Sequence, residues 1–210
     1  KINGEWTKGV NRGEPVNTMD NEGAQTISAD GRFLVYTVCN RREDFGACDL
    51  YYAENVNGQW TKPQNIGAPV NSAAWESQPS LSADGRTLYF VSSRNGGKGK
   101  KDIWVTYKMR NGKWMKPRNL GDVINTKGDE ASPFIHADGQ TLYFSSNGHV
   151  GMGESDIFMT TRQADGTWST PKNLGYPINT KRQENSLVIS LDGKTGYFAS
   201  DRTDSKGATD

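Results

Sequence analysis

Apolar residues come in short runs, separated by segments rich in Gly, Asn, Asp and Ser. One stretch shows the arrangement. The run RTLYFVS follows Asp84-Gly85, a Gly-rich segment leads to DIWVTYKM, and Asn111-Gly112 precedes KWMKPRN. Asp-Gly and Asn-Gly between apolar runs are typical of tight hairpin turns, because those turns need positive φ. The pattern predicts an antiparallel meander of four strands over Ser77–Ser82, Arg86–Ser92, Asp102–Met109 and Lys113–Asn119.

This unit is repeated along the chain with a period of 54 residues. Five residue types keep that spacing: Trp6, Trp60, Trp114 and Trp168; Gly13, Gly67, Gly121 and Gly175; Asn17, Asn71, Asn125 and Asn179; Glu22, Glu76, Glu130 and Glu184; Asp30, Asp84, Asp138 and Asp192. A small sheet that cannot bury both faces alone, repeated in tandem, is typical of a β-propeller. We therefore expect an all-β fold, a β-propeller of four-stranded antiparallel blades.

The whole chain, residues 1–210, is expected to belong to this propeller, with blade repeats starting near Trp6, Trp60, Trp114 and Trp168. The register predicts an outer strand at the N-terminus, three complete blades, and the first two strands of another blade. Propellers have about four to eight blades. The expectation is therefore a slice of a larger propeller. The repeated aromatic residues are expected to pack between blades.

Composition and charge exclude several classes of function. The 25 Lys and Arg against 24 Asp and Glu give a formal charge of +1, which does not indicate a nucleic-acid partner. No run approaches the roughly 18 apolar residues of a transmembrane helix. The chain does not open on a charged-then-apolar leader, so we expect any export signal to have been removed or to lie outside it.

The repeat also resembles a known family. The second copy carries Glu76-Ser-Gln-Pro, Ser82-Ala-Asp-Gly, Leu88-Tyr-Phe and Asp102-Ile-Trp, and the third copy carries the same pattern. This pattern resembles the PD40 (WD40-like) β-propeller repeat. The 54-residue length and the segment from Trp168 to Thr180 resemble the propellers of Bacteroidota OmpA-family envelope proteins, and more distantly the TolB family.

The resemblance implies a periplasmic protein attached to the outer membrane. It implies a non-catalytic scaffold in an envelope assembly, such as type IX secretion, with envelope or secretion-system proteins as partners. It also implies neighbouring tetratricopeptide and OmpA-like domains. Peptidoglycan would be bound only through such a domain, which is not visible in these 210 residues. No cofactor is implied.

Two cysteines bear on the compartment. By register, Cys39 ends the second strand of its blade and Cys48 begins the third. These strands are antiparallel neighbours, so we expect a disulfide that closes residues 40–47. Such a bond implies an oxidising compartment, here the periplasm or the cell surface. A metal site at two Cys without a nearby His is not expected.

The repeated glutamates and aspartates admit more than one interpretation. Glu22, Glu76, Glu130 and Glu184 precede the innermost strand and could form an acidic ring around the channel that binds a cation. The structural alternative is that each Glu pairs with polar groups of its own blade, as repetition favours. A calcium-stabilised module is a second alternative function. Asp102, Asp156 and Asp210 are expected to tether the loop before the third strand. In the first copy Cys48 takes that register, so the disulfide would replace the tether.

The loops between the second and third strands differ most between copies, and loops on a rigid scaffold commonly carry binding. Two of them are basic, and the candidate partner-binding residues are Arg41, Arg42, Trp75, Arg94, Lys98, Lys100, Lys101 and His149. They could meet an acidic partner or a glycan, or form a solvated rim. Trp75 breaks the repeat and is the best candidate for an aromatic platform in a carbohydrate-binding propeller.

The sequence gives little indication of catalytic activity. The two histidines are His136, in a register otherwise held by Ser, and His149, in a Gly-rich loop. There is no G-x-S-x-G nucleophile elbow. A glycoside-cleaving propeller would need an acid pair or an arginine cluster with a Tyr nucleophile, and Gly148 interrupts the register of Arg94 and Arg202. We therefore expect no catalytic residues, with a carbohydrate-binding or glycoside-cleaving propeller as the alternative.

Overall fold

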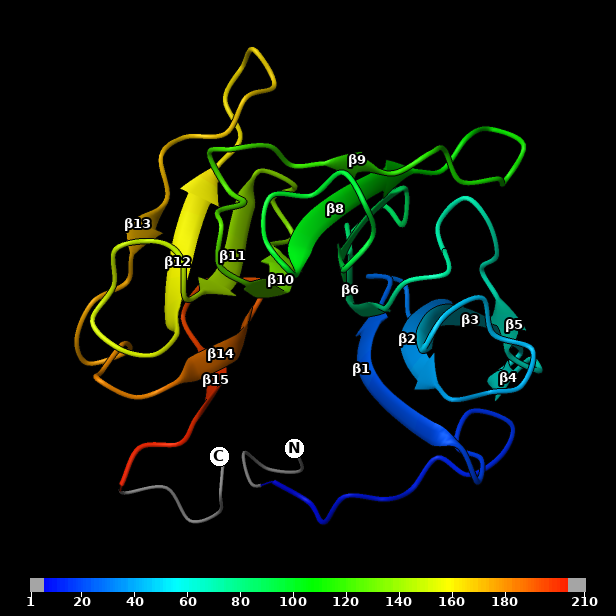
Figure 1. Ribbon diagram of the computed structural model, residues 1–210. Helices are drawn as coiled ribbons and strands as arrows, with labels where there is room; N and C mark the ends of the chain where they lie inside the picture. The colour runs from blue at the N-terminus through cyan, green and yellow to red at the C-terminus, as the bar shows by residue number, and fades with distance from the viewer. Residues whose placement is uncertain (1–5, 204–210) are drawn as a thin grey trace.

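The computed structural model describes residues 6–203, which form four antiparallel sheets around a common centre (Figure 1). The first sheet has the order β1-β2-β3-β4, and β5 also pairs with β3. Its strands are β1 (Asn21–Ile27), β2 (Phe33–Cys39), β3 (Cys48–Val56), β4 (Gln59–Trp60) and β5 (Gln64–Asn65). The sheet is the first blade of the expected propeller.

The next two sheets repeat this arrangement, and the last is shorter. The second blade contains β6 (Glu76–Leu81), β7 (Thr87–Ser92), β8 (Asp102–Tyr107) and β9 (Arg118–Asn119). The third contains β10 (Glu130–Ile135), β11 (Thr141–Ser146), β12 (Asp156–Thr161) and β13 (Lys172–Asn173). The fourth contains β14 (Glu184–Ile189) and β15 (Gly196–Ser200). The all-β propeller fold with four-stranded antiparallel blades is therefore confirmed.

The first strand of each blade lies towards the middle of the arrangement (Figure 1). Contacts join β1 to β6, β6 to β10, and β10 to β14, so consecutive blades meet along their inner strands. Hydrogen bonds cross these contacts: Ser80 Oγ accepts from Ile135 N at 2.9 Å, and Thr26 Oγ1 accepts from Leu81 N at 3.1 Å. Within residues 6–203 no helix is long and apolar enough to cross a bilayer.

Apolar side chains from neighbouring blades pack into shared clusters. One cluster joins Tyr89 and Ile103 of the second blade to Leu142 and Phe144 of the third. The repeated Trp168 extends this contact, because its ring meets Tyr89 edge to face with centroids 6.3 Å apart, within the range of about 4.5–7 Å for such pairs. Burying each such side chain contributes about 1.5–3 kcal/mol, so the blades stabilise one another.

The outer strand of each blade is shorter than the sequence pattern predicts. Regular pairing covers Arg118–Asn119 rather than Lys113–Asn119, with an isolated bridge between Lys108 and Trp114. Pro63, Pro117 and Pro171 stand directly before β5, β9 and β13. Proline has no N–H to donate to the ladder, which explains the interruption.

The predicted outer strand at the N-terminus is not formed in the described part of the chain. Residues 1–5 lie outside the described residues, and no strand is formed over residues 7–13. Trp6 nevertheless packs edge to face on Tyr197, with ring centroids 5.6 Å apart. Tyr197 and Tyr89 share one register, so Trp6 makes the same kind of contact with the fourth blade that Trp168 makes with the second.

A bulge recurs in every inner strand. Ladder register shifts occur between Gly23 and Gln25 and at the corresponding places of β6, β10 and β14. The bulged residues have positive φ in all four blades: Ala24, Gln78, Ser132 and Ser186. A bulge bends its strand and re-aims the neighbouring side chains. The inner strands thereby turn these residues towards the centre.

Candidate functional site

A buried asparagine fixes each linker loop, the segment that joins one blade to the next (residues 66–75, 120–129 and 174–183). Asn71 Oδ1 accepts from Leu50 N and its Nδ2 donates to Leu50 O, both at 2.9 Å. Asn125 and Asn179 make the same pair of bonds with Ile103 and Ile157. The side-chain amide thus extends the ladder of the third strand, and the linker loop is held in place.

The repeated glutamates are the first residues of β6, β10 and β14, and they are fully buried. Glu76 accepts from Ser72 N at 2.8 Å, from Ser72 Oγ at 2.8 Å and from Ser92 Oγ at 2.6 Å. Glu130 and Glu184 accept from equivalent Thr and Ser groups. Each carboxylate therefore joins a linker loop to the second strand of its own blade, away from the cavity at the centre.

Most of the repeated glutamates lie close to an arginine side chain. The arginine occupies one of two neighbouring positions of the repeat. Arg94 lies 3.1 Å from Glu76, and Arg202 lies 3.5 Å from Glu184. In the first blade Arg41, one position later in the repeat, lies 3.3 Å from Glu22. The third blade has Gly148 at the arginine register and His149 at the Arg41 register.

His149 takes over part of the role of the arginine. Its Nε2 lies 2.8 Å from Ile124 O, the carbonyl that corresponds to the Val70 O bound by Arg94. Its ring packs between Phe144 and Phe158, with centroids 5.7 and 5.1 Å away. This position is structural support for the third linker loop.

The aspartate before the third strand tethers the 2–3 loop, the loop between the second and third strands (residues 40–47, 93–101 and 147–155). Asp102 accepts from Lys98 N and from Gly99 N, and Asp156 accepts from Met152 N at 2.6 Å. These tethers agree with the sequence prediction, and Asp210 lies outside the described residues.

The prediction that the disulfide replaces this tether in the first blade is wrong. Asp49, not Cys48, occupies the structural position of Asp102, because it accepts from Phe45 N at 2.8 Å and from Asn65 Nδ2 at 2.6 Å. Val38 pairs with Asp49 in the first blade as Ser92 pairs with Asp102 in the second, so one more residue lies between the two partners in the first blade and the register shifts. Burial raises the pKa of Asp49, and the bonds from Phe45 N and Asn65 oppose that rise.

Each 2–3 loop lies directly against the linker loop that follows its blade in the sequence. A Cβ at Gly99 would lie 1.8 Å from Gly128 O, and one at Gly153 would lie 2.3 Å from Arg182 O. Gly46 makes the same approach, with Ala74 O as the nearest atom at 1.7 Å. Only glycine permits such contact. The two sets of loops therefore form one interlocked surface, which we call the loop face.

The structure separates the candidate binding residues into two groups. Arg41 lies 2.6 Å from Asp20 and over the Tyr51 ring, and Arg94 donates to carbonyls of a linker loop, so both support the fold. Lys98 pairs with Asp122 at 2.7 Å. Arg42 and Lys100 are exposed and are absent from the ion pairs found among residues 6–203.

Two further cations of this face were not among the residues predicted from the sequence. Lys127 and Lys181 follow the repeated Asn-Ser/Thr pair in their linker loops, and both are exposed. They occupy the same position of the 54-residue repeat, and this spacing could have identified them from the sequence. Together with Arg42 and Lys100 they give the loop face a basic character.

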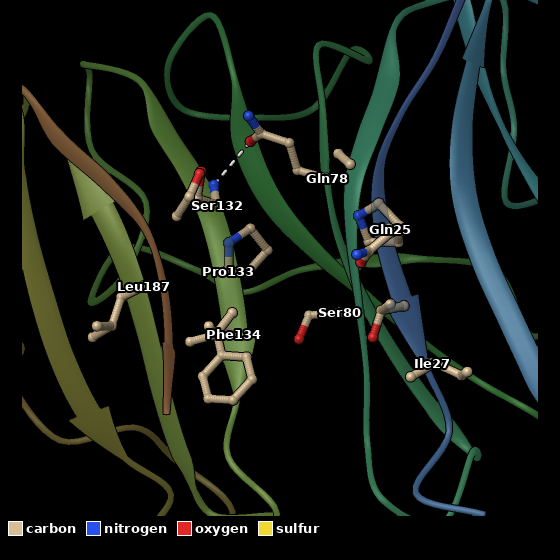
Figure 2. A pocket seen from close by; sticks show the side chains of 13 residues that line it. Gln25, Ile27, Gln78, Ser80, Ser132, Pro133, Phe134 and Leu187 are labelled. Atoms are coloured by element: carbon tan, nitrogen blue, oxygen red, sulfur yellow. Dashed lines mark hydrogen bonds between the residues drawn. The ribbon is translucent and has the colours of Figure 1, made fainter. Parts of the chain in front are cut away.

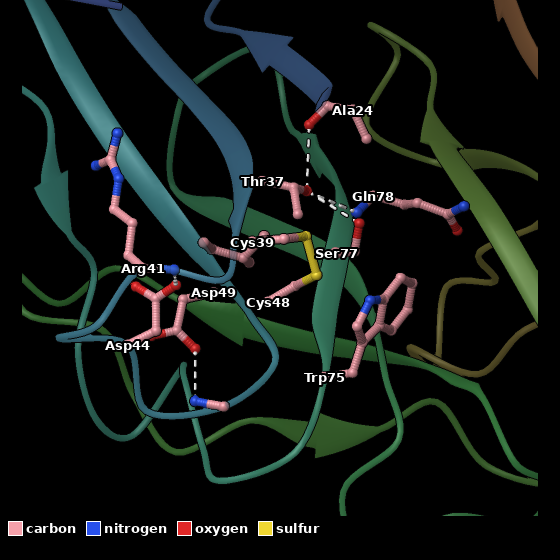
Figure 3. The surroundings of a disulfide bond; sticks show 12 residues. Ala24, Thr37, Cys39, Arg41, Asp44, Cys48, Asp49, Trp75, Ser77 and Gln78 are labelled. Carbon is pink, nitrogen blue, oxygen red and sulfur yellow. Dashed lines mark hydrogen bonds between the residues drawn. A yellow bond between two sulfur atoms is a disulfide. The ribbon is translucent and has the colours of Figure 1, made fainter. Parts of the chain in front are cut away.

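The predicted disulfide is present. Cys39 and Cys48 are cross-linked between β2 and β3, at paired positions of the ladder. Trp75 lies beside the bond (Figure 3), where its backbone bridges to Cys48 and Lys101 Nζ lies 4.7 Å above its ring. Trp75 is half-buried against the core between the second and third blades. Disulfides of this kind persist in oxidising, extracytoplasmic compartments.

A cavity of about 500 Å³ lies at the centre, where the four inner strands converge (Figure 2). It is lined by residues two to five positions beyond the repeated glutamates, among them Gln78, Ser132 and Phe134. Gln78 Oε1 accepts from Ser132 N of the next blade at 2.8 Å. The lining is polar and apolar but carries no carboxylate, so the glutamates do not form a ring on this wall.

His136 lies between the Asp138 turn of its own blade and the fourth blade. His136 Nδ1 lies 3.3 Å from Asp138, and its Nε2 lies 3.4 Å from Ser190 O of the next blade. Asp138 is held by Thr141 N and Oγ1; although burial opposes the change, these bonds lower its pKa to about 2. Among the described residues no three His, Cys, Asp or Glu are grouped as a metal site.

The blades, their inner cavity and the interlocked loop face define a β-propeller. No protein-family model and no curated protein matches the chain. Solved structures do. TolB from Acinetobacter baumannii is 17% identical with a TM-score of 0.60, and the match covers 89% of this chain and 39% of that one.

Two further structures show the same fold. A putative TolB from Agrobacterium tumefaciens is 20% identical, with a TM-score of 0.52 over 88% of this chain and 59% of that chain. A prolyl endopeptidase is 18% identical, with a TM-score of 0.52 over 86% of this chain and 23% of that chain. The chain thus spans less than two thirds of each of these proteins, and the likeness is one of fold.

Proposed function

We propose that this protein is a non-catalytic binding scaffold of the bacterial cell envelope, which presents its loop face to an acidic protein partner. The observation that carries the proposal is the interlocking of the 2–3 loops with the linker loops. Glycine contacts, buried asparagines and buried glutamates hold this face rigid while its exposed side chains differ between blades. A preorganised surface loses little conformational entropy on binding.

The charge of the loop face supports an acidic partner. Arg42, Lys100, Lys127 and Lys181 are exposed there, and they are outside the ion pairs formed within residues 6–203. Unpaired surface cations raise the association rate with an anionic surface more than they raise the final affinity. Such a face suits a partner whose docking surface is rich in Asp and Glu.

The envelope location rests on two supports. The disulfide requires an oxidising compartment, and the repeat pattern resembles the periplasmic OmpA-family propellers, PorE of the type IX secretion system among them. On this proposal the protein lies in the periplasm, attached to the outer membrane. Peptidoglycan would be reached through a separate domain.

The test is a pull-down from cross-linked envelope with the intact protein as bait and mass spectrometry of the prey. The variant Lys100→Glu/Lys127→Glu/Lys181→Glu reverses the charge of the loop face. The control Arg32→Glu/Arg86→Glu/Lys194→Glu makes the same charge change at exposed positions after the Asp-Gly turns, at the opposite ends of the inner strands.

We expect the wild type and the control to capture the same acidic envelope or secretion-system protein and the loop-face variant to lose it. Equal capture by all three baits would contradict the assignment of the loop face. Retention of glycans without any protein prey would favour the carbohydrate-binding alternative.

A further inference from the structure

A groove of about 520 Å³ opens between the first and second blades, apart from the central cavity, and Ile66, Ala68 and Pro69 of the first linker loop form one of its walls. Residues of both blades line it, among them Phe33, Tyr52, Lys108, Lys113 and Trp114. Its volume falls in the range of roughly 300–1,000 Å³ that is common for ligand sites. Three aromatic rings and two ammonium groups thus face one space.

The groove is formed by residues that depart from the repeat. Phe33 occupies a register that holds Thr in the other three copies, at Thr87, Thr141 and Thr195. Tyr52 pairs with Val35, whereas the corresponding ladder positions pair Val105 with Tyr89 and Met159 with Tyr143. Residues that repeat serve every blade, so two aromatic residues confined to one blade need a local explanation.

Val35 accounts for the space. In the contact between the second and third blades, Trp168 packs edge to face on Tyr89. In the contact between the first and second blades, Val35 holds the register of that tyrosine, and Trp114 packs against the apolar cluster that includes Val35. The smaller side chain leaves the volume beside Trp114 open, and Tyr52 borders it from the first blade.

The aromatic rings are organised by their own contacts. Phe33 and Tyr52 stack with centroids 5.3 Å apart and an interplanar angle of 30°. Tyr52 OH donates to Gln64 Oε1 at 2.9 Å, which orients its ring. Lys108 Nζ lies 4.3 Å from the Phe33 centroid and 5.7 Å from that of Trp114. Cation–π contact of this kind holds the ammonium group between the blades.

The charges of the groove are unbalanced. Lys108, Lys113 and Glu54 all line it, and none of the three takes part in an ion pair with another residue in the range 6–203. Two cations against one anion, neither neutralised within the protein, favour a ligand that carries negative charge. The half-buried position of Lys108 strengthens that preference, because screening by water is weaker there.

We propose that this groove binds an acidic glycan. Sugar rings lie against Tyr52 and Trp114, since the negative face of an aromatic ring attracts the C–H face of a pyranose. The sugar carboxylates pair with Lys108 and Lys113 as charge-assisted hydrogen bonds. This function is additional to the protein-binding role of the loop face and does not depend on it.

The outer strands favour a glycan over an acidic peptide. A peptide that adds to a sheet needs a long free strand edge. The outer strands of the two blades that form the groove, β4, β5 and β9, are each two residues long, so they offer little main chain for pairing. Recognition must therefore come from side chains, which here are aromatic and cationic.

The test is calorimetric titration of the full chain with a panel of acidic oligosaccharides, namely oligogalacturonate, oligoalginate and hyaluronan fragments. Neutral cello-oligosaccharides and oligoglutamate serve as ligand controls. The variant Phe33→Thr/Tyr52→Val gives the first blade the residues that the second blade has at these positions. Lys113→Gln changes an exposed residue of the groove, and Tyr176→Val and Lys116→Gln are matched controls outside it.

We expect at least one acidic oligosaccharide to bind, with neutral sugars weaker by about tenfold or more. The double variant and Lys113→Gln should each weaken binding by a similar factor, while both controls stay unchanged. If the double variant unfolds, the affinity of Lys113→Gln alone tests whether the groove binds the oligosaccharide. Three results would overturn the proposal: no acidic oligosaccharide binds, the groove variants bind normally, or oligoglutamate binds as tightly and reassigns the groove to acidic peptides.

Discussion

Nη2 of Arg94 lies 3.1 Å from Oε1 of Glu76, a carboxylate with no exposed surface. Burial lowers the pKa of Arg94, and the charge of Glu76 opposes that change. The third blade keeps the carboxylate, as Glu130, and replaces the guanidinium by Gly148 and His149. One chain thus contains a buried carboxylate with an arginine partner and an equivalent one without it.

This pair of sites allows a matched comparison. Glu76→Gln removes the charge that faces the half-buried Arg94, and breaking a buried pair in this way costs about 3–5 kcal/mol. Glu130→Gln removes only bonds from hydroxyl and amide donors, for a smaller expected cost of about 1–3 kcal/mol. Urea unfolding of both variants measures the difference. Equal losses would show that Arg94 contributes little to the network.

Loss of the disulfide should destabilise the first blade. Cys39 and Cys48 close a loop with a sequence separation of 9, for which the loop-entropy estimate is about 2–3 kcal/mol. The double variant Cys39→Ser/Cys48→Ser should lose this amount of unfolding free energy in urea titrations. A reducing agent should have the same effect on the wild type and none on the variant. Unchanged stability after verified reduction would refute the assignment.

The interlocking of the loop face can be tested at one glycine. Gly153→Ala would place a Cβ 2.4 Å from Thr180 O, so the 2–3 loop must move. We expect a loss of about 1–3 kcal/mol, as for other overpacked sites, and faster proteolysis within residues 147–155. Gly23→Ala is the control, because nothing lies within 4 Å of its added Cβ. If both variants resist protease equally, the loops are not interlocked.

Acid should weaken the turn at Asp138. Its pKa is lowered to about 2 in the folded protein from a usual value of 3.8, so the carboxylate stabilises the fold fully above the unfolded pKa. That contribution is lost as the pH falls from about 4 to 2. Since the side chain is 43% exposed, solvent screening limits the effect to about 1 kcal/mol. Unfolding of wild type and Asp138→Asn between pH 2 and 6 should show a stability gap that closes in acid.

The two flanks of the blade array expose residues that are buried between inner blades. Ile27 is 50% exposed where Leu81 is 6% exposed, and Tyr197 is 44% exposed, even with Trp6 packed on it, where Tyr89 is 2% exposed. We expect further blades to cover these flanks in a larger propeller. A polypeptide of these 210 residues should therefore self-associate in light scattering, and Ile27→Lys/Tyr197→Lys should reduce this. Association that survives the double variant would argue against apolar flanks as its cause.

Much of the fold could be predicted from the sequence because local chemistry recurs with one period. Asp84-Gly85 and Asn111-Gly112 define turns by their own φ preferences, and the strands between them follow closely, as with Thr87–Ser92 against the predicted Arg86–Ser92. The disulfide followed from the same register, since antiparallel neighbours bring the ends of two strands together.

The roles of the site residues were harder to predict. The sequence pattern of a repeated glutamate is identical whether its side chain lines a channel or is buried in its blade. Only the packing of the blades distinguishes these two positions. The shift that gives Asp49 the place of Asp102 comes from one extra residue between the paired positions of β2 and β3, and no local pattern reveals where it is accommodated. The sequence pattern made Trp75 the best candidate for an aromatic platform, whereas the structure places it half-buried beside the disulfide.

The sequence by itself therefore determined the repeat, the blade, its turns and the cross-link, because these depend on residues close together along the chain. The tertiary structure decided which repeated carboxylates are buried, which cations remain unpaired and where the repeat opens into a groove. Phe33 of the first blade and Trp114 of the second reach the same space although 81 residues separate them. Such a contact depends on how two blades pack against each other. The sequence pattern within one blade does not specify that packing.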